Sequence, residues 1–523
     1  MLSIGALFPV TLTLLTLLVL RCIQHRRDPA SKPTLEAHWL WGHEYVVWQH
    51  EACAMYLKWA TDLGPLYRIK ASFFQRDVIV AADNLASHHI LANAYRYHVL
   101  PAKAPAFLPL TDKLLGKGVV YAQGDEHKHQ RRLIAPAFTL GAVKGMSDDV
   151  VECTQKFVER VANHVGSQGY ETTMDIAPFV SACTLDIIGR IAFGHDFGCG
   201  ESKEARDIAE SWHKDVLLGR TMAGFLAPIM MCAFPWITEL PIPALQTDGV
   251  AKRVAINLAG ELLRQNKAQL ESGDGKDILS ILVKDQKKSK HDERLSQTTL
   301  LENVSLEMVG HETTSCTVSF TLLELARHPA VQQKLRQEIR DLSDFSYDHI
   351  QSLPYLDAVC REGLRVHPAA PRTDRIALED DVIPLSQPLT TVDGKTVSSI
   401  AIKAGQVFHI PNAVQNIDPF VWGKDAEEFK PERWLLSGGV PSADQLPHGP
   451  YGNIASFLDG PRSCIGWRLA LLEFKIMISL LIRDFELIST PDDVKGYISG
   501  TLQAFVGEEV KMPIHVKMLR SSE

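Results

Sequence analysis

Hydrophobic residues recur at helical spacing over most of this chain. Between residues 86 and 365 the apolar positions repeat every three to four residues, which predicts a long succession of amphipathic helices. Before that region, residues 63–69 and 77–81 carry strand-forming side chains around a Gly-Pro turn and predict an early β-hairpin. After it the pattern is strand-like, and it returns to a helix over residues 467–485. We therefore expect a mainly α-helical fold with small β-sheets.

The N-terminal residues are apolar but do not show this regular alternation of apolar and polar positions. Residues 4–20 contain no charged side chain, and Arg21, Arg26 and Arg27 follow them. An apolar run of about 17 residues is the minimum for a membrane helix, and positive charge on its C-terminal side keeps that side in the cytosol. We expect residues 1–21 to be a single transmembrane helix that precedes a cytosolic domain. A cleaved signal peptide is the alternative, but its positive charges would precede the apolar run.

Composition favours one large globular domain. Of the 523 residues, 46% are hydrophobic and 22% are charged, and neither an internal repeat nor a long Gly/Ser-rich linker divides the chain. We assign residues 22–60 to a linker and the start of this domain, and residues 61–523 to the domain proper. The net charge of −8 argues against a nucleic-acid partner. The nine cysteines are odd in number and lack paired spacing, which is typical of reduced, cytosol-facing thiols.

One cysteine has a setting that predicts chemistry. Cys464 stands just before the C-terminal helix, in a segment that also contains Phe457, Gly460, Arg462 and Gly466. The N–H groups and positive dipole at a helix start lower the pKa of a thiol, as a metal-bound thiolate requires. The glycines let the backbone turn and approach a flat macrocycle, Phe457 can pack beside the sulfur, and Arg462 can bind a haem propionate. We interpret Cys464 as the axial ligand of a haem iron; the alternative is a buried structural cysteine.

These residues match the pattern F-x-x-G-x-R-x-C-x-G, and the chain resembles the cytochrome P450 family over nearly all of its length after the N-terminal segment. The resemblance implies the cytochrome P450 fold, haem b as cofactor, and insertion of one oxygen atom from O2 with two electrons. Residues 61–523 would then be a haem-thiolate monooxygenase domain. The resemblance also implies electrons from NADPH through NADPH-cytochrome reductase, with cytochrome b5 as a further donor, and a place in the endoplasmic reticulum membrane.

A second motif lies in the helix predicted over residues 296–327, where Gly310, Glu312 and Thr313 stand together. Gly310 and Thr313 share one helix face, so the missing side chain leaves room for O2 beside the hydroxyl. The threonine hydroxyl can bond to a helix carbonyl, and Glu312 can feed protons inward for cleavage of the O–O bond. The run resembles the oxygen-activating motif of the family, with Val309 where a small residue is usual. The alternative is a helix in which these residues have no chemical role.

Three charged residues are expected to be structural. Glu362 and Arg365 are three apart on a predicted helix that ends at His367, and Arg433 follows in a later segment. By themselves such residues indicate little, because similar pairs are frequent on solvated helix faces. By resemblance, however, the three form a buried charge triad that braces the loop approaching Cys464.

Three further residues are expected to bind the haem propionates. The resemblance implies a helix in which a tryptophan and, four residues later, an arginine hold one propionate; here these positions are His127 and Arg131. An imidazole can still donate a hydrogen bond to a carboxylate, and Arg131 keeps the stronger charge-assisted contact. Arg375 falls where the family often places another propionate ligand; the alternative is a surface arginine.

Two surfaces are expected to contact other molecules. Four basic residues can form a landing site for the reductase on the cysteine side of the haem: Lys424, Lys430, Arg468 and Lys475. By resemblance, the loop between residues 95 and 120 covers the substrate, and the apolar stretch over residues 212–245 forms access helices that dip toward the membrane.

The predicted function is hydroxylation of a lipophilic substrate. Two segments expected to line the cavity, residues 369–371 and 501–505, are mostly apolar. The chain looks like fungal members of the family that oxidise terpenoids and other secondary metabolites, and fatty-acid hydroxylation is the second possibility. A non-catalytic haem-binding carrier or sensor is the alternative from another class, and a haem-thiolate isomerase or dehydratase, which would turn over without NADPH, lies between them.

Overall fold

The computed structural model describes residues 37–99, 116–234, 237, 240, 249–265, 278–280, 282, 297–391 and 394–519. Within these ranges no helix is both long enough and apolar enough to cross a bilayer. The anchor predicted over residues 1–21 lies outside the described residues, as does most of the loop between residues 95 and 120.

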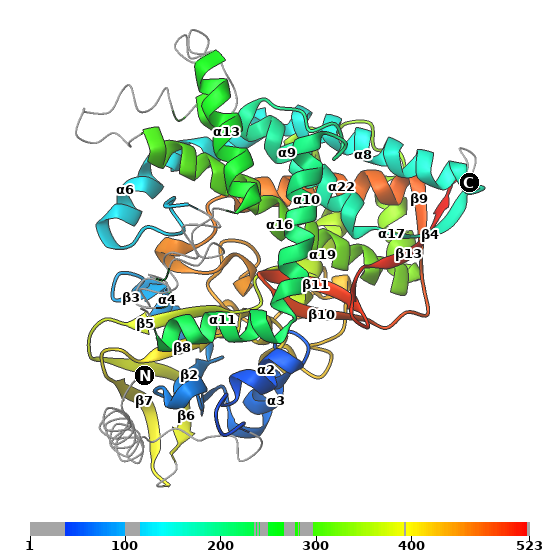
Figure 1. The fold of residues 1–523 in the computed structure, drawn as a ribbon. Coiled ribbons are helices and arrows are strands. Elements are labelled where there is room, and N and C mark those ends of the chain that lie inside the picture. The colour runs from blue at the N-terminus through cyan, green and yellow to red at the C-terminus, as the bar shows by residue number, and fades with distance from the viewer. Residues whose placement is uncertain are drawn as a thin grey trace.

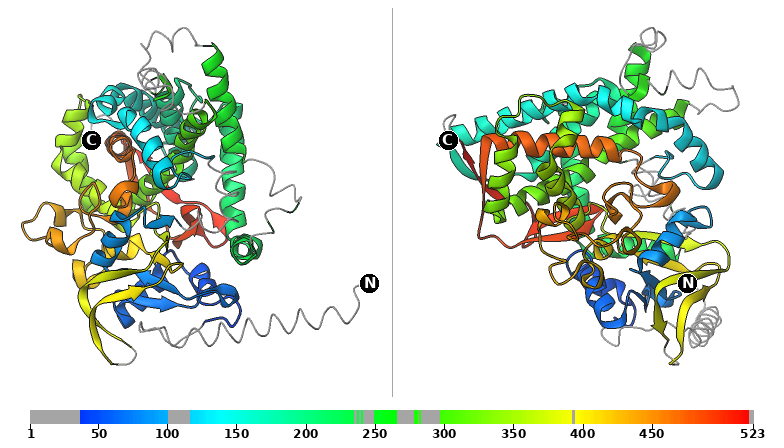
Figure 2. Two further views of the ribbon diagram at one scale, coloured as in Figure 1. Left: turned by 90° about the vertical axis from the view of Figure 1, so that its left-hand side faces the viewer. Right: turned by 180° about the vertical axis from the view of Figure 1, so that it is seen from behind.

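The protein is mainly α-helical with small sheets, as predicted. In Figures 1 and 2 the long helices gather on one side of the molecule, and the largest sheet lies on the other with the N-terminal helices against it. The described helices are α2 (Glu44–Gln49), α3 (Ala54–Leu63), α4 (Asn84–Ala92), α6 (Gly124–Ile134), α7 (Leu140–Gly145), α8 (Ser147–Ser167), α9 (Ala177–Phe193), α10 (Lys203–Gly219), α11 (Met222–Ala233), α13 (Val250–Gln265), α16 (Gln297–Arg327), α17 (Pro329–Ile339), α18 (Tyr347–Ser352), α19 (Pro354–Val366), α20 (Asn412–Ile417), α21 (Pro419–Trp422) and α22 (Trp467–Asp484).

Helix α16 runs through the middle of the helical side and packs against α9, α13, α19 and α22. Its crossing with α19 depends on Gly363, because a Cβ atom there would collide with the Thr321 hydroxyl of α16. The same Cβ would come within 3.2 Å of the Phe474 ring on α22. A glycine in a helix costs about 1 kcal/mol relative to alanine. Here it allows three helices to meet closely at the Glu362–Arg365 segment.

The largest sheet has the strand order β1-β2-β8-β5-β3, and the predicted hairpin forms its β1–β2 edge as an antiparallel pair. Three smaller sheets have the orders β10-β11-β12, β4-β13-β9 and β6-β7. The strands are β1 (Leu66–Ile69), β2 (Val78–Ala81), β3 (Tyr97–Val99), β4 (Glu171–Asp175), β5 (Thr373–Ala377), β6 (Asp381–Thr390), β7 (Thr396–Ile402), β8 (Val407–Ile410), β9 (Phe485–Ser489), β10 (Val494–Ser499), β11 (Thr501–Val506), β12 (Glu509–Val510) and β13 (Pro513–Met518).

The helical pattern predicted from residue 86 to residue 365 misses two of these strands, β3 and β4. Strand β4 has only one buried residue, Met174, and it pairs with β13 more than 300 residues later in the chain. A strand this short is fixed by its distant partner, so local periodicity could not reveal it.

Candidate functional site

The segment that carries Cys464 is a tight loop. It runs from one short 3-10 helix, η9 (Ala455–Phe457), through a second, η10 (Gly460–Arg462), to the start of α22. The Cys464 amide donates to the Phe457 carbonyl at 2.8 Å, and the Ser463 amide donates to the Gly460 carbonyl at 3.0 Å. These bonds close the loop on itself. The Cys464 side chain is exposed, three residues before α22 begins at Trp467, so the amides of that helix start lie next to it.

The two glycines of this loop have different reasons to be glycine. Gly460 has φ +67°, and a Cβ atom there would collide with the Leu91 carbonyl at the end of α4. Gly466 has a negative φ of −87°, and a Cβ atom there would meet only the Phe138 ring at 3.7 Å, an ordinary contact. The protein itself therefore requires glycine at 460 but not at 466. A requirement at 466 would come from a flat ligand close to the backbone, as the sequence predicts.

Three arginines from distant parts of the chain converge beside this loop and form what we call the arginine cluster: Arg131 on α6, Arg375 on β5 and Arg462 on η10. Burial lowers the pKa of both Arg375 and Arg462 to about 10. Repulsion contributes to both shifts: the charge of Arg462 lowers the pKa of Arg375, and the charge of Arg131 lowers the pKa of Arg462. Burial also lowers the pKa of Arg131, which the nearby Cys464 and Tyr95 partly oppose. The cluster is thus a concentration of positive charge at the cysteine.

No acidic side chain of the described residues forms an ion pair with this cluster. Asp374 is the sequence neighbour of Arg375, but its carboxylate pairs with Arg372 at 2.9 Å. Arg375 and Arg462 donate mainly to carbonyl and uncharged side-chain oxygens, and the Nε atom of each is buried without a hydrogen-bond partner. Buried donors are rarely left unsatisfied in proteins, and buried charges are normally paired. The arginine cluster is therefore suited to bind an anionic group.

His127 lies on α6 one turn before Arg131, at the position where the sequence departs from the family pattern. Its side chain is buried, and Nδ1 lies 3.3 Å from the Tyr95 hydroxyl oxygen. Burial, with repulsion from Arg462 and Arg131, lowers the pKa of this imidazole to about 4. His127 is therefore neutral at neutral pH and keeps one N–H that can bind an anion.

These residues fit a haem with two propionate groups. A thiol at a helix start suits the iron, and the arginine cluster with its unsatisfied Nε atoms suits two carboxylates. The structure thus brings Cys464, Arg462, Arg131, His127 and Arg375 into one neighbourhood, although they come from three separate regions of the sequence. Their contacts to haem remain a prediction.

The second predicted motif lies in the middle of α16. The Thr313 hydroxyl donates to the Gly310 carbonyl at 2.8 Å, and its side chain is exposed. A Cβ atom added to Gly310 would meet no atom within 4 Å, so the protein leaves open space at this face. A side chain that bonds to a helix carbonyl competes with the backbone and loosens the helix locally. The Val309 side chain is not among the side chains that the structure describes.

Glu312, the residue before Thr313 on α16, is buried. Its Oε1 atom accepts hydrogen bonds from the Ser181 hydroxyl at 2.7 Å and from His311 Nε2 at 3.1 Å. Burial by itself would raise the pKa of this carboxyl, but the bonds from His311, Ser181 and Gln503 outweigh burial and lower it. Glu312 is therefore an ionised carboxylate held in a fixed orientation. Ser181 on α9 is a residue that the sequence did not point to, and Gln503 on β11 lies in the segment expected to line the cavity but was not predicted to contact Glu312; only packing brings both to α16.

The predicted charge triad is a closed, buried network. Arg365 donates to both carboxylate oxygens of Glu362, at 2.8 and 2.9 Å, and Arg433 Nε donates to Oε1 at 2.9 Å. The Trp434 indole and the Lys430 amide also donate to this carboxylate, at 2.9 and 2.8 Å. The side chains of Glu362 and Arg365 are fully buried, and that of Arg433 is 3% exposed. Arg433 also pairs with Asp425 Oδ1 at 3.5 Å, so each of the two buried arginines has a carboxylate partner within the protein.

The prediction that Lys475 belongs to a basic surface for the reductase is wrong. Lys475 is buried in α22, where its amine donates to Asp357 Oδ1 at 2.6 Å and to Gln351 Oε1 at 2.7 Å. Almost all of α22 is interior, so a lysine on it can be charged only with an internal acid. Lys475 is therefore a structural ion pair.

The two segments expected to line the substrate cavity lie side by side. The Leu502 amide of β11 donates to the Ala369 carbonyl at 3.0 Å, and the Cys316 thiol of α16 donates to the Leu502 carbonyl at 2.8 Å. Leu502, Ala504 and Phe505 are buried, with exposed fractions of 5%, 7% and 3%. An apolar wall thus adjoins α16, the helix that carries Thr313. The seven cysteines whose side chains the structure describes form no disulfide, as predicted.

Comparison with known proteins gives a consistent result. A family model for cytochrome P450 matches residues 33–511 of this chain. Cytochrome P450 monooxygenase 205 of Postia placenta is 31% identical over 505 residues, which cover 92% of this chain and 91% of that protein. Cytochrome P450 monooxygenase claQ of Ampulloclitocybe clavipes is 31% identical over 493 residues, which cover 91% of this chain and 90% of that protein. Both organisms are fungi.

Proposed function

Because this chain belongs to the cytochrome P450 family and is a cytochrome P450 monooxygenase, we propose that it hydroxylates a lipophilic substrate, specifically a terpenoid or another secondary metabolite. The single observation that carries the proposal is the arrangement on α16. An accessible threonine hydroxyl bound to a helix carbonyl adjoins open space at Gly310, and an ionised, buried carboxylate stands at Glu312, the residue immediately before Thr313. A haem carrier or sensor would need neither group.

The cofactor that the family implies is haem bound through a thiolate, and when bound it supplies the iron at which O2 is reduced by two electrons. In our proposal Cys464 is the axial ligand, and the amides at the start of α22 stabilise its charge. The arginine cluster and the neutral His127 bind the two propionates. Phe457, buried at the base of the loop, fixes the backbone on which the cysteine stands through its carbonyl bond to the Cys464 amide.

Proton delivery is assigned to Thr313 and Glu312. The Thr313 hydroxyl proton is engaged with the Gly310 carbonyl, so the hydroxyl oxygen is left to accept a hydrogen bond from water or substrate. Glu312 exchanges protons with the interior while Ser181 and His311 hold its carboxylate in place. The family's isomerases and dehydratases need no such relay, so the presence of both groups favours oxygen insertion.

Thr313→Ala is expected to uncouple the enzyme. Loss of the hydroxyl removes the group that places protons at the reaction centre, so we expect NADPH oxidation to continue while most of the electrons appear as hydrogen peroxide. The measurement is the ratio of product to peroxide, and Thr314→Ala, on the neighbouring helix position, is the matched control. Fully coupled turnover in Thr313→Ala would contradict the role of this residue.

Substrate and redox partner follow from the surfaces around the site. Buried apolar residues of β11 beside α16 favour a lipophilic substrate. We propose that NADPH-cytochrome reductase delivers the electrons and that Lys424, Lys430 and Arg468 contribute to its docking surface. The Lys430 side chain is 47% exposed and pairs with Asp425 at 2.7 Å, and Arg468 lies over the Trp467 ring at 4.2 Å at the start of α22.

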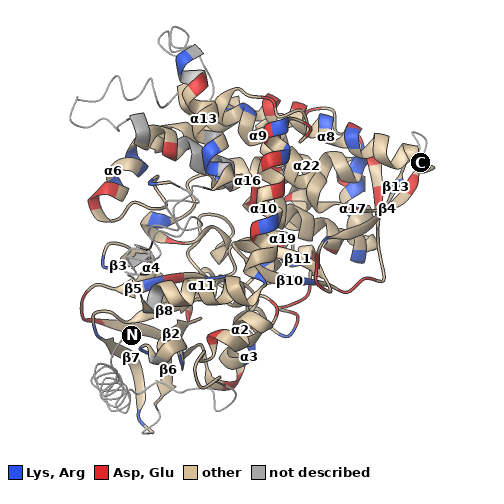
Figure 3. Ribbon diagram, viewed as in Figure 1, with Lys and Arg blue, Asp and Glu red and all other residues tan. Residues whose placement is uncertain are grey.

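We further propose that the protein is anchored in the endoplasmic reticulum membrane with its domain in the cytosol. Helix α11 carries no charged residue and is uncoloured in Figure 3, whereas α10 carries both signs. Large apolar side chains are exposed close to it: Leu218, Met222 and Phe234 at 53%, 43% and 36%. The Phe225 ring of α11 packs against Trp41, which ties this surface to the N-terminal part of the described chain. Such an apolar surface is suited to a lipid bilayer.

The deciding experiment is a haem spin-state titration of the purified protein with sesquiterpenes, triterpenes and long-chain fatty acids. Displacement of iron-bound water by a fitting substrate changes the Soret spectrum. A saturable shift with one terpenoid class supports the proposal and names the compound for turnover with reductase, NADPH and O2. A shift with fatty acids alone would replace the terpenoid with a fatty acid, and product formed without NADPH would indicate an isomerase or dehydratase.

A further inference from the structure

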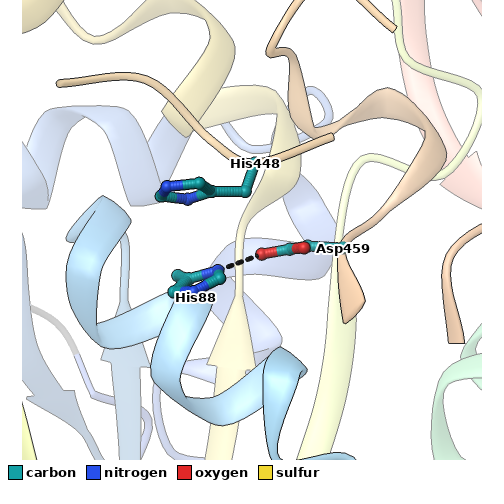
Figure 4. A group of neighbouring side chains, drawn as sticks. All are labelled: His88, His448 and Asp459. Atoms are coloured by element: carbon teal, nitrogen blue, oxygen red, sulfur yellow. Dashed lines mark hydrogen bonds and ion pairs between the residues drawn. The ribbon is translucent and has the colours of Figure 1, made fainter. Parts of the chain in front are cut away.

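Two histidines and an aspartate converge at the surface on the cysteine side of the site, and neither the sequence motifs nor the proposed reaction uses them (Figure 4). His88 comes from α4, His448 from the loop after η8 (Ala443–Gln445), and Asp459 from the turn between η9 and η10. One possible ligand atom from each residue lies within 4.8 Å of the other two. In Figure 4 the His448 ring lies over His88, and the carboxylate of Asp459 points to both.

The side chains already interact in a way that orders them. His88 Nδ1 donates to Asp459 Oδ2 at 2.6 Å, and the His88 and His448 ring centroids are 4.0 Å apart. The other carboxylate oxygen, Oδ1, accepts the Gly460 amide at 2.5 Å, which fixes the orientation of the carboxylate. Outer hydrogen bonds of this kind hold the ligands in known metal sites.

Two imidazoles and one carboxylate are a donor set with a chemical preference. Imidazole nitrogen and carboxylate oxygen bind Zn²⁺ at about 2.0–2.2 Å, whereas Mg²⁺ and Ca²⁺ prefer oxygen ligands alone. The three residues also line one small recess that opens to solvent, so an ion can enter and a water can complete a fourth position. Because His448 is exposed, its ring can rotate to shorten the ligand distances without disturbing the core.

We propose that His88, His448 and Asp459 form a site for one Zn²⁺ ion that fastens α4 to the loop of the axial cysteine. Asp459 precedes Gly460, whose backbone packs against the Leu91 carbonyl of α4, and Cys464 follows in the same loop. An ion that joins His88 to Asp459 therefore stabilises the contact on which the loop rests. This inference does not depend on the identity of the substrate.

Zinc binding to the haem-loaded enzyme tests the site directly. After equilibrium dialysis against Zn²⁺, elemental analysis should find one ion per protein that Mg²⁺ does not displace, and zinc-edge X-ray absorption should show two imidazoles and no sulfur. His448→Ala and Asp459→Asn should each weaken binding at least about 10-fold, since loss of even an outer partner costs about 10- to 100-fold. His349→Ala is the matched control, because His349 pairs with Asp344 at 3.2 Å without a second histidine.

The proposed role of zinc in fastening α4 to the cysteine loop can be measured separately from zinc binding. Zn²⁺ should slow the heat-induced loss of the red-shifted, thiolate-dependent spectrum of the reduced carbon-monoxide complex in the wild type, and it should have no such effect in His448→Ala. Equal zinc affinity in the wild type and both variants, or sulfur ligation at the zinc edge, would overturn the site. Equal rates of spectral loss with and without zinc in the wild type would overturn the fastening role.

Discussion

Two buried groups of arginines in this protein differ in what balances their charge. Arg365 and Arg433 share the carboxylate of Glu362, and the remaining donors of Arg365 reach the carbonyls of Asn416, Ala426 and Glu428. The arginine cluster has no such acid among the described residues, and its members repel one another. The first network is compensated by acids of the chain, whereas the second has no ion-pair partner among the described residues. This difference in charge compensation supports a structural role for the first group and the ligand-binding role that we propose for the second.

This distinction has a physical basis in the cost of burying charge. A buried ion without a partner costs several kcal/mol of folding free energy. A stable fold is therefore expected to contain one only where a ligand compensates its charge. The largest fully buried side chains of the protein include one arginine from each group, Arg365 and Arg375. Equal burial with unequal compensation predicts opposite responses to substitution.

Glu362→Gln should have the largest effect on stability. The substitution keeps the shape of the side chain but leaves two buried arginines without their shared charge, so the free energy of unfolding should fall by about 3–5 kcal/mol. Chemical denaturation followed by circular dichroism measures this loss. Glu432→Gln is the control, since Glu432 pairs with the exposed Lys334 at 2.6 Å and should contribute about 1 kcal/mol or less. Similar losses in both variants would remove the distinction between the two groups.

Arg131→Met should weaken haem binding and leave the haem-depleted protein nearly unchanged. A charge-assisted hydrogen bond contributes about 1.5–3 kcal/mol, which corresponds to about a 10- to 100-fold faster loss of haem. Transfer of haem to an excess of apomyoglobin measures the rate. Arg132→Met removes the exposed neighbouring arginine and should have no effect. If Arg131→Met destabilised the haem-depleted protein as much as Glu362→Gln does, Arg131 would be structural.

Arg375→Met should lower the stability of the haem-bound protein but not that of the haem-depleted protein. In the haem-depleted protein the variant loses a desolvated cation that Arg462 repels, so the free energy of unfolding should stay within about 1 kcal/mol of the wild type or increase. In the haem-bound protein it should decrease, because a propionate loses its partner. Thermal unfolding of both forms measures the two values, and a decrease of equal size in both would contradict a ligand-binding role.

The smallest effect should be a pH dependence from His127. Burial and the two nearby arginines lower its pKa to about 4 from the ordinary 6.5, so between these values the unfolded chain binds a proton that the folded protein does not. The contribution of His127 is complete above pH 6.5 and declines as the pH falls toward 4. Because glutamine stays neutral, the denaturation midpoint of the haem-depleted wild type should fall relative to that of His127→Gln as the pH decreases from 6.5 toward 4. In the haem-bound protein a propionate would raise the pKa and reduce the difference.

Local sequence was sufficient where residues act through their immediate neighbours. The cysteine loop, the Gly310–Thr313 face and the Glu362–Arg365 pair each fit within a few residues, and the structure places each as a short-range arrangement. The sequence could not locate Ser181, whose bond to Glu312 spans 131 positions of the chain. It also placed Lys475 on the surface, because a single lysine in an apolar helix gives no sign of the acid that meets it inside.

What the sequence alone determined is the chemistry: a thiol before a helix, an alcohol and an acid on a long helix, and a carboxylate between two arginines. Such features depend on residue identity and spacing, which are fixed before folding. Only the tertiary structure decided which charges are compensated, since compensation depends on distances between segments that are far apart in the chain. It closed the network around Glu362, left Arg131, Arg375 and Arg462 facing one another, and brought His88 to Asp459 across 371 positions.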